Sequence, residues 1–263
     1  MSDQNQDTVL RAARLLDDAA REARAVPQFS NEHAFDLPTA YAIQRAVVGQ
    51  RIARGASRIG MKMGFTSRAK MAQMGVSDMI WGRLTSDMLL EEGGEVDLSR
   101  FIHPRVEPEI CFLLKRPLAG IVTPMQALAA VEALAPALEI IDSRYQDFKF
   151  SVPDVVADNA SSAALVVGRW HAPDTDVGNL GLILGFDGRP AELGSTAAIL
   201  GHPIRALVAA ARLAAEHGET LEAGHLIMAG GATAAAALPV GAGVRCEMQS
   251  LGSVAFRTSA KEN

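Results

Sequence analysis

The sequence lacks the features that mark secreted and membrane-bound proteins. Its two cysteines, Cys111 and Cys246, lie far apart and form neither a disulfide framework nor a CxxC pair, so we interpret both as buried free thiols in a reducing compartment. Residues 1–6 are polar and contain no apolar stretch of a secretion signal, and there is no run of about 18 apolar residues that could cross a membrane. We therefore expect a soluble, cytoplasmic protein that does not bind membranes.

The sequence also lacks the charge pattern and the motifs of several large function classes. The formal net charge is −5 and no cluster of lysine and arginine is dense enough to bind nucleic acid, so we expect no nucleic-acid partner. The motifs GxxxxGK[ST], HExxH and GxSxG are absent, as is a GxGxxG after a strand, and none of the six histidines has a zinc-binding spacing. Nucleotide hydrolysis, Rossmann redox chemistry, zinc peptidase and serine hydrolase activity thus have no sequence support.

What the sequence does contain is a β-rich body that follows a helical start. Helical spacing over residues 7–26, and from Asp36 to Gly55 with Pro38 in the first turn, precedes an alternating apolar strand at residues 59–64. Further strands are predicted at 105–114, 137–142, 164–167, 181–186, 225–229, 244–248 and 254–257, and further helices at about 123–135 and 203–217. Because strands do not alternate strictly with helices, we predict an α+β fold, with a mostly helical region at residues 1–75 and a β-rich catalytic domain at residues 76–263.

Three glutamates in predicted strands are candidate metal ligands. Glu107 and Glu109 are two residues apart, which places both side chains on one face of the strand, and Glu139 lies within another apolar strand segment. Close carboxylates repel one another and burial adds to the cost, and a bound cation would resolve both. Three oxygen ligands suit Mg²⁺ or Mn²⁺. The pattern alone leaves open that Glu107 and Glu109 line an exposed strand face and that Glu139 pairs with an arginine.

Other polar residues stand in or at the ends of predicted strands. Lys62 lies between two glycines that would let a ligand approach the backbone closely, although a solvated lysine is the commoner outcome. The segments 142–144 and 158–162 are polar clusters at strand ends, where sites tend to form. The segment Gly230-Gly231-Ala232-Thr233 could offer backbone N–H groups and a hydroxyl to a carboxylate, and turn formation alone would also explain its glycines.

Several segments together resemble a known family. They are Met61–Ser67 with Ala69–Val76, Ile141–Phe150 with Val156–Ser162, Leu200–Pro203, Ile227–Ala234 and Leu251–Val254, and they follow in order over nearly the whole chain from about Tyr41. In these segments the sequence is similar to the 4-oxalocrotonate decarboxylases of aromatic meta-cleavage pathways, in the fumarylacetoacetate hydrolase superfamily, which also includes the 2-oxopent-4-enoate hydratases. The resemblance implies a mixed β-roll of that superfamily's type, with a small helical N-terminal region and one Mg²⁺ or Mn²⁺.

The resemblance also implies roles for particular residues. The family's Glu-x-Glu motif and its third acidic ligand correspond to Glu107, Glu109 and Glu139, and its active-site lysine corresponds to Lys62. On this basis we expect a catalytic set and a substrate-binding set that share two residues. The catalytic set is Lys62, Asp142, Arg144 and Ser161, and the substrate-binding set is Lys62, Ser161 and Thr233.

The reaction that the resemblance implies is decarboxylation of 2-oxohex-3-enedioate (4-oxalocrotonate), a small 2-oxo dicarboxylic acid, to 2-hydroxypenta-2,4-dienoate. The related hydratases tend to carry an acid where this sequence has Ile80, and Asp78 is two positions away from that place. The alternatives are a 2-oxopent-4-enoate hydratase, an acylpyruvate-type C–C hydrolase and a non-catalytic subunit that stabilises an enzyme partner. A complex with a 2-oxopent-4-enoate hydratase and a homo-oligomer are both open.

Overall fold

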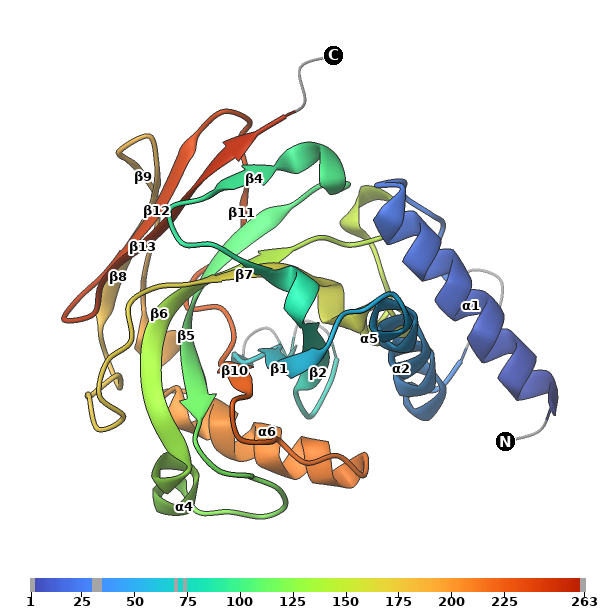
Figure 1. The fold of residues 1–263 in the computed structure, drawn as a ribbon, viewed down its shortest axis with the longest axis horizontal. Coiled ribbons are helices and arrows are strands. Elements are labelled where there is room, and N and C mark those ends of the chain that lie inside the picture. The colour runs from blue at the N-terminus through green and yellow to red at the C-terminus, as the bar shows by residue number, and fades with distance from the viewer. Residues whose placement is uncertain (1–2, 30–34, 69–70, 73–74, 261–263) are drawn as a thin grey trace.

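The computed structural model describes residues 3–29, 35–68, 71–72 and 75–260, so residues 69–70 and 73–74, which carry part of the family resemblance, lie outside it (Figure 1). Its helices are α1 (Asp3–Arg21), α2 (Leu37–Ala53), α4 (Pro124–Ala129), α5 (Val152–Ala157) and α6 (Ile204–Glu216). Its strands are β1 (Arg58–Gly64), β2 (Ile80–Thr85), β3 (Leu89–Leu90), β4 (Glu95–Asp97), β5 (Arg105–Leu114), β6 (Val131–Ile141), β7 (Ser162–Val167), β8 (Gly181–Phe186), β9 (Arg189–Ser195), β10 (Leu226–Met228), β11 (Ala236–Ala237), β12 (Gly243–Met248) and β13 (Gly252–Ser259).

Within the described residues these strands form two sheets. The larger sheet has eight strands in the order β2-β1-β10-β5-β6-β7-β3, with β11 also paired to β5, and the smaller has five in the order β4-β13-β12-β8-β9. Figure 1 shows β5 and β6 strongly curved, with the smaller sheet at the upper left, α1, α2 and α5 on the right, and α4 and α6 below. Parallel pairs (β1 with β10, β3 with β7) occur beside antiparallel ones, so the predicted α+β fold with mixed, rolled sheets is confirmed.

The two faces of the larger sheet bury different residues. A large apolar core includes residues of α1, α2, α6 and both sheets. A smaller apolar cluster occupies the other face and consists of Leu84, Met88, Cys111, Ala137, Leu165, Leu226 and Met228. Lys62 is in register with Met228, and Met228 with Cys111, so the lysine shares this face. The smaller cluster is therefore the apolar floor next to any site that Lys62 and the β5 glutamates form.

Local sequence signals account for several elements. Asp36 caps α2 as its side chain accepts a hydrogen bond from the Thr39 N–H at 2.9 Å, and Pro38 lies in the first turn as predicted. β5 spans the predicted residues 105–114, and β8 the predicted residues 181–186. α1 ends at Arg21, five residues before the predicted end.

One predicted helix is wrong over its second half. We expected a helix from about 123 to 135, but α4 ends at Ala129 and β6 begins at Val131. Alanine-rich residues favour helix, but Pro136 cannot continue one, and β6 pairs with β5 from Val131↔Leu114 to Ile141↔Arg105. Strand pairing across the sheet therefore overrides local propensity here.

Some elements have no clear local signal. The sequence does not predict β2, because all six of its residues are buried and polar and apolar residues do not alternate in it. It also misses β4, β9 and α5. β1 pairs with both β2 and β10, so residues 58–64 complete the larger sheet, and the division of the chain at residue 75 stays a prediction.

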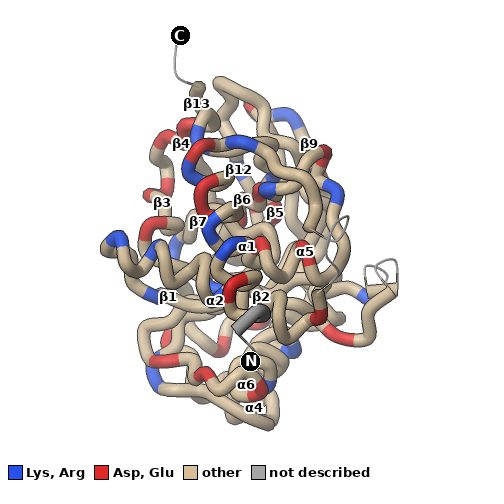
Figure 2. The backbone as a smooth tube through the Cα atoms, turned by 90° about the vertical axis from the view of Figure 1, so that its right-hand side faces the viewer, with Lys and Arg blue, Asp and Glu red and all other residues tan. Residues whose placement is uncertain are grey.

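Charged residues of both signs occur throughout the chain. In the view of Figure 2, acidic and basic positions are interspersed along the backbone. Within the described residues, no helix is both long and apolar enough to span a membrane.

Candidate metal centre

The register of β5 and β6 brings three carboxylates together on the inner face of the larger sheet. Glu107 lies opposite Glu139, and Glu109 follows two residues along the same face of β5. One carboxylate oxygen from each of the three lies within 4.8 Å of the others. Glu109 and Glu139 are fully buried and Glu107 is partly buried. The alternative of an exposed strand face is therefore wrong.

Two of these carboxylates are held by the chain through one oxygen only. Glu109 Oε2 accepts a hydrogen bond from the Gly230 N–H at 2.7 Å, and Glu139 Oε1 accepts one from Ser162 Oγ at 2.9 Å. The other oxygens, Glu109 Oε1 and Glu139 Oε2, are buried and have no hydrogen-bond donor among the described residues. Burial is the largest cause that raises the pKa of Glu109 well above its ordinary value, and the negative charge of Glu139 is the second largest. A hard divalent cation would fit this set. It would supply a partner to Glu109 Oε1, which accepts no hydrogen bond among the described residues, and a second cation to Glu139 Oε2, whose partner is the Lys62 ammonium at 3.1 Å.

Lys62 is buried beside the carboxylates. Its Nζ donates to the Ala160 carbonyl at 2.8 Å and forms an ion pair with Glu139 Oε2 at 3.1 Å, without the geometry of a hydrogen bond. Burial by itself lowers the pKa of this ammonium, but the charges of Glu139, Glu107 and Glu109 outweigh it and raise the pKa. Lys62 is therefore charged. Because it is buried, the alternative of a solvated lysine is wrong. Because Glu139 pairs with Lys62, the alternative of an arginine partner is also wrong.

The segment 159–161 brings the chain close to Lys62. Asn159, Ala160 and Ser161 all have positive φ, at 51°, 51° and 58°. The Asn159 amide holds this turn to β2, since it accepts from the Arg83 N–H at 2.7 Å and donates to the Arg83 carbonyl at 2.9 Å. A Cβ on Gly82 would lie 2.5 Å from the Asn159 carbonyl oxygen, so only glycine allows this approach. The sequence singled out this polar cluster but gave no role to Asn159 or to the Gly82 beneath it.

The two neighbouring serines have different surroundings. Ser161, the predicted catalytic and substrate-binding residue, has a buried hydroxyl with no hydrogen-bond partner among the described residues. Ser162, to which the sequence assigned no role, donates to Glu139. No local pattern distinguishes the two, because the choice depends on the register of β7 against β6, which shifts between Ile140 and Ile141. The catalytic role of Ser161 stays a prediction.

Asp142 and Arg144 form hydrogen bonds within the chain. The Asp142 carboxylate accepts from the N–H groups of Ile102 and His103, at 2.8 Å each, and so fixes the turn before β5. The buried Arg144 guanidinium forms an ion pair with Asp158 and also donates to its carbonyl. These contacts position the segments on either side of the carboxylates, and the predicted catalytic roles of Asp142 and Arg144 remain predictions.

The glycine segment after β10 serves the carboxylates through its backbone. The Gly230 N–H donates to Glu109. A Cβ added to Gly231 would lie 3.1 Å from Glu107 Cδ, so the backbone passes close to that carboxylate. The Thr233 hydroxyl donates to the Ala234 carbonyl at 2.8 Å. Its described hydrogen bond therefore does not join it to the three glutamates, and substrate binding by Thr233 remains a prediction.

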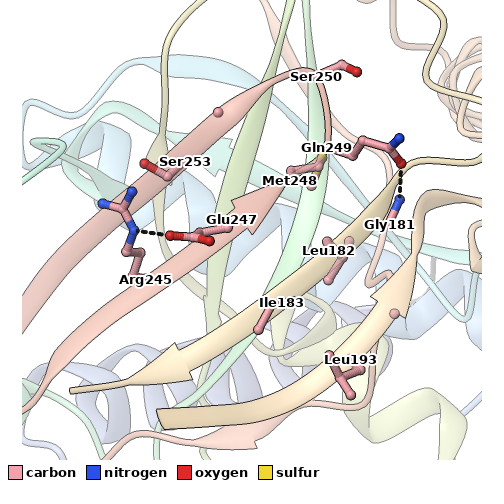
Figure 3. Close-up of a pocket in the computed structure, with 12 residues that line it drawn as sticks. Gly181, Leu182, Ile183, Leu193, Arg245, Glu247, Met248, Gln249, Ser250 and Ser253 are labelled. Carbon is pink, nitrogen blue, oxygen red and sulfur yellow. Dashed lines mark hydrogen bonds and ion pairs between the residues drawn. The ribbon is translucent and has the colours of Figure 1, made fainter. Parts of the chain in front are cut away.

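A separate cavity lies elsewhere on the molecule. It measures about 680 Å³ and is lined by residues of β8, β9, β12 and β13 in the smaller sheet (Figure 3). Its lining includes the exposed Leu193 and an ion pair between Arg245 and Glu247 at 3.0 Å, but none of the three glutamates. The cavity thus has no part in the metal centre.

Comparisons with known proteins show the family of this chain. The family described as fumarylacetoacetate (FAA) hydrolase C-terminal matches residues 61–258. A 4-oxalocrotonate decarboxylase of Pseudomonas sp. is 65% identical over 96% of this chain and 99% of its own, and a 2-hydroxyhexa-2,4-dienoate hydratase of Comamonas testosteroni is 36% identical over 89% and 90%. The solved structure of a 4-oxalocrotonate decarboxylase from Pseudomonas putida G7, complexed with magnesium and adipate, has a TM-score of 0.93 at 39% identity and covers 96% of this chain and 98% of that one. The chain therefore belongs to the fumarylacetoacetate hydrolase family, in the group that contains the 4-oxalocrotonate decarboxylases and their related hydratases.

Proposed function

We propose that this chain is a carboxy-lyase that converts 2-oxohex-3-enedioate to 2-hydroxypenta-2,4-dienoate and CO₂ in aromatic meta-cleavage catabolism, with Mg²⁺ or Mn²⁺ as its cofactor. The observation that carries the proposal is the set of Glu107, Glu109 and Glu139, in which Glu109 and Glu139 each have one buried oxygen that accepts no hydrogen bond from the described residues. That set occurs in a chain 65% identical to a 4-oxalocrotonate decarboxylase.

The residues suit the charge movement of this reaction. The C5–C6 bond breaks, C6 leaves as CO₂, and the electron pair moves through the C3–C4 double bond to the C2 oxygen, which then takes a proton. When bound, the cation supplies positive charge that stabilises this oxygen. Glu107, Glu109 and Glu139 would hold the cation, and Lys62 keeps a second positive charge beside Glu139. The apolar floor formed by the smaller cluster limits the access of water to the product dienol.

Two observations favour decarboxylation over hydration. Hydration needs a group that deprotonates a water and directs it at carbon. Ile80 is buried, shares the face of Lys62 and packs on Gly64, and its side chain cannot accept a proton. The Asp78 carboxylate accepts two hydrogen bonds from Arg212 of α6, at 2.9 and 2.8 Å, which hold it away from that position.

A product assay tests the proposal. We expect Mg²⁺-loaded protein to release CO₂ and the dienol from 2-oxohex-3-enedioate. When the dienol is supplied directly, we expect little 4-hydroxy-2-oxopentanoate. Hydration of the dienol at a rate that equals or exceeds decarboxylation would assign the chain to the hydratases, and Asp78→Asn would then test whether Asp78 is the missing acid.

We also propose that the chain hands its product to a 2-oxopent-4-enoate hydratase in a complex, because the dienol is a reactive compound and such hydratases consume it. Co-elution of the two purified proteins on gel filtration tests this, and the elution volume of the chain alone tests for a homo-oligomer. Separate elution would contradict the complex. The cytoplasmic location stays a prediction from the sequence.

A further inference from the structure

We propose that Arg105 binds the distal carboxylate of the substrate and so gives the site its preference for dicarboxylates. This inference rests on the proposed function, since it concerns which 2-oxo acid the metal centre accepts. The sequence indicates no role for Arg105 and points to Lys62 as the cation of the site.

The position of Arg105 along β5 supports this role. Cys111, Glu109, Glu107 and Arg105 follow one another at two-residue intervals, so their side chains share one face of the strand. Along this row burial decreases, from Cys111 and Glu109, which are fully buried, through the partly buried Glu107 to the exposed Arg105. The row therefore runs from the apolar floor, past the carboxylates, to a basic residue at the solvent end.

The spacing also fits the length of the substrate. A strand advances about 7 Å over two residues, so Arg105 Cα lies about that far from Glu107 Cα. Two extended residues contain six backbone atoms, and an extended six-carbon dicarboxylate has a similar length. A substrate whose C1 and C2 end lies at the metal centre and whose chain extends outward along β5 would thus bring its distal carboxylate to Arg105.

The charges of the site lead to the same assignment. Three carboxylates and the Lys62 ammonium give −3 + 1 = −2, and a divalent cation brings the sum to zero. Lys62 is already bound to Glu139 and to the Ala160 carbonyl, so its charge is shared. A substrate with two carboxylates therefore needs a further cation, and Arg105 has no carboxylate partner among the described residues.

Aromatic contacts hold Arg105 at this end of the site. Its guanidinium carbon lies 4.5 Å from the centre of the Phe148 ring, on which a planar cation can rest. The ring of His103, in the turn before β5, has its centre 5.0 Å from that of Phe148. The buried His103 Nε2 has no hydrogen-bond partner in the part of the chain that the structure describes. The Arg105 guanidinium and the His103 ring thus both lie against Phe148, where a carboxylate could accept hydrogen bonds from the guanidinium and from His103 Nε2.

Two probes that differ only in the distal carboxylate test this inference. Binding of 2-oxohexanedioate and of 2-oxohexanoate to the Mg²⁺-loaded protein would be measured by calorimetry for the natural chain, Arg105→Met and Arg105→Lys. The control is Arg245→Met, which removes an exposed arginine of the smaller sheet. We expect Arg105→Met to raise the Kd for 2-oxohexanedioate by about 10- to 100-fold, the usual scale for a charge-assisted hydrogen bond. The Kd for 2-oxohexanoate should change by less than about twofold. Arg105→Lys should restore part of the loss.

Steady-state kinetics give a second measurement. The distal carboxylate loses its negative charge as CO₂ forms, so its contact with Arg105 is weaker in the transition state than in the ground state. Arg105→Met should therefore raise KM more than it lowers kcat. Equal weakening of both probes, or no weakening of the dicarboxylate, would overturn the inference. If Arg105→Met selectively weakens binding of the dicarboxylate but the natural chain releases no CO₂, the role of Arg105 is upheld and the decarboxylase assignment is refuted. If CO₂ is released and Arg105→Met does not affect its release, the decarboxylase assignment is upheld and the role of Arg105 is refuted.

Discussion

Replacing Ser162 with alanine should weaken metal binding, although this serine is not among the three glutamates. Its hydroxyl donates to Glu139 Oε1 at 2.9 Å, and both side chains are almost fully buried, so the alanine variant leaves this oxygen without its donor in a desolvated place. A hydrogen bond to a charged group contributes about 1.5–3 kcal/mol. Loss of a partner that orients a metal ligand typically reduces metal affinity by about 10- to 100-fold. We therefore expect the Kd for Mg²⁺ to rise by about that factor.

Calorimetric titration of Mg²⁺ into metal-free protein measures this Kd, and circular dichroism at the same pH checks that the variant is folded. Ser161→Ala is the matched control, because it removes a hydroxyl from the neighbouring residue, whose oxygen has no partner among the described residues. We expect its Kd for Mg²⁺ to stay within about twofold of the natural value, since no ligand loses a donor. Equal losses in both variants, or no loss in Ser162→Ala, would refute the assignment of Glu139 as a ligand held by Ser162.

Further predictions concern the metal centre, Lys62 and the two buried thiols. Chelation should abolish decarboxylation, and added Mg²⁺ or Mn²⁺ should restore it. The Glu107→Ala variant should bind neither ion. Normal turnover of the chelated protein would contradict the metal centre. Lys62→Met should lower kcat by at least about a hundredfold, the scale of one electrostatic contact in the transition state, and borohydride trapping of a substrate adduct on Lys62 would show covalent catalysis instead. Burial raises the pKa of Cys246 to about 12 and that of Cys111 further, so neither thiol should react with a disulfide reagent at pH 8 until the chain is unfolded, and a fast reaction of the native protein would contradict this burial.

The sequence by itself determined features that depend on neighbours in the chain. The period of two in a strand places Glu107 and Glu109 on one face, and the whole of β5 could be predicted from that pattern. Asp36 and Pro38 mark the start of α2 because a cap and a fixed φ act within one turn. The pattern also marked Glu139 and Lys62 as candidates, and the resemblance to a family joined them to the other two in one site.

Only the tertiary structure decided which groups surround the carboxylates. Glu139 meets Glu107 through the register of β6 on β5, and Lys62 reaches Glu139 through the position of β1 beside β10. Ser162, and not Ser161, donates to Glu139 because the register of β7 on β6 is shifted at this point. A strand, and not a longer helix, follows Ala129 because β6 pairs with the distant β5. Local propensity differs by less than about 1 kcal/mol per residue between such states, so burial and hydrogen bonding across the sheet determine which one forms.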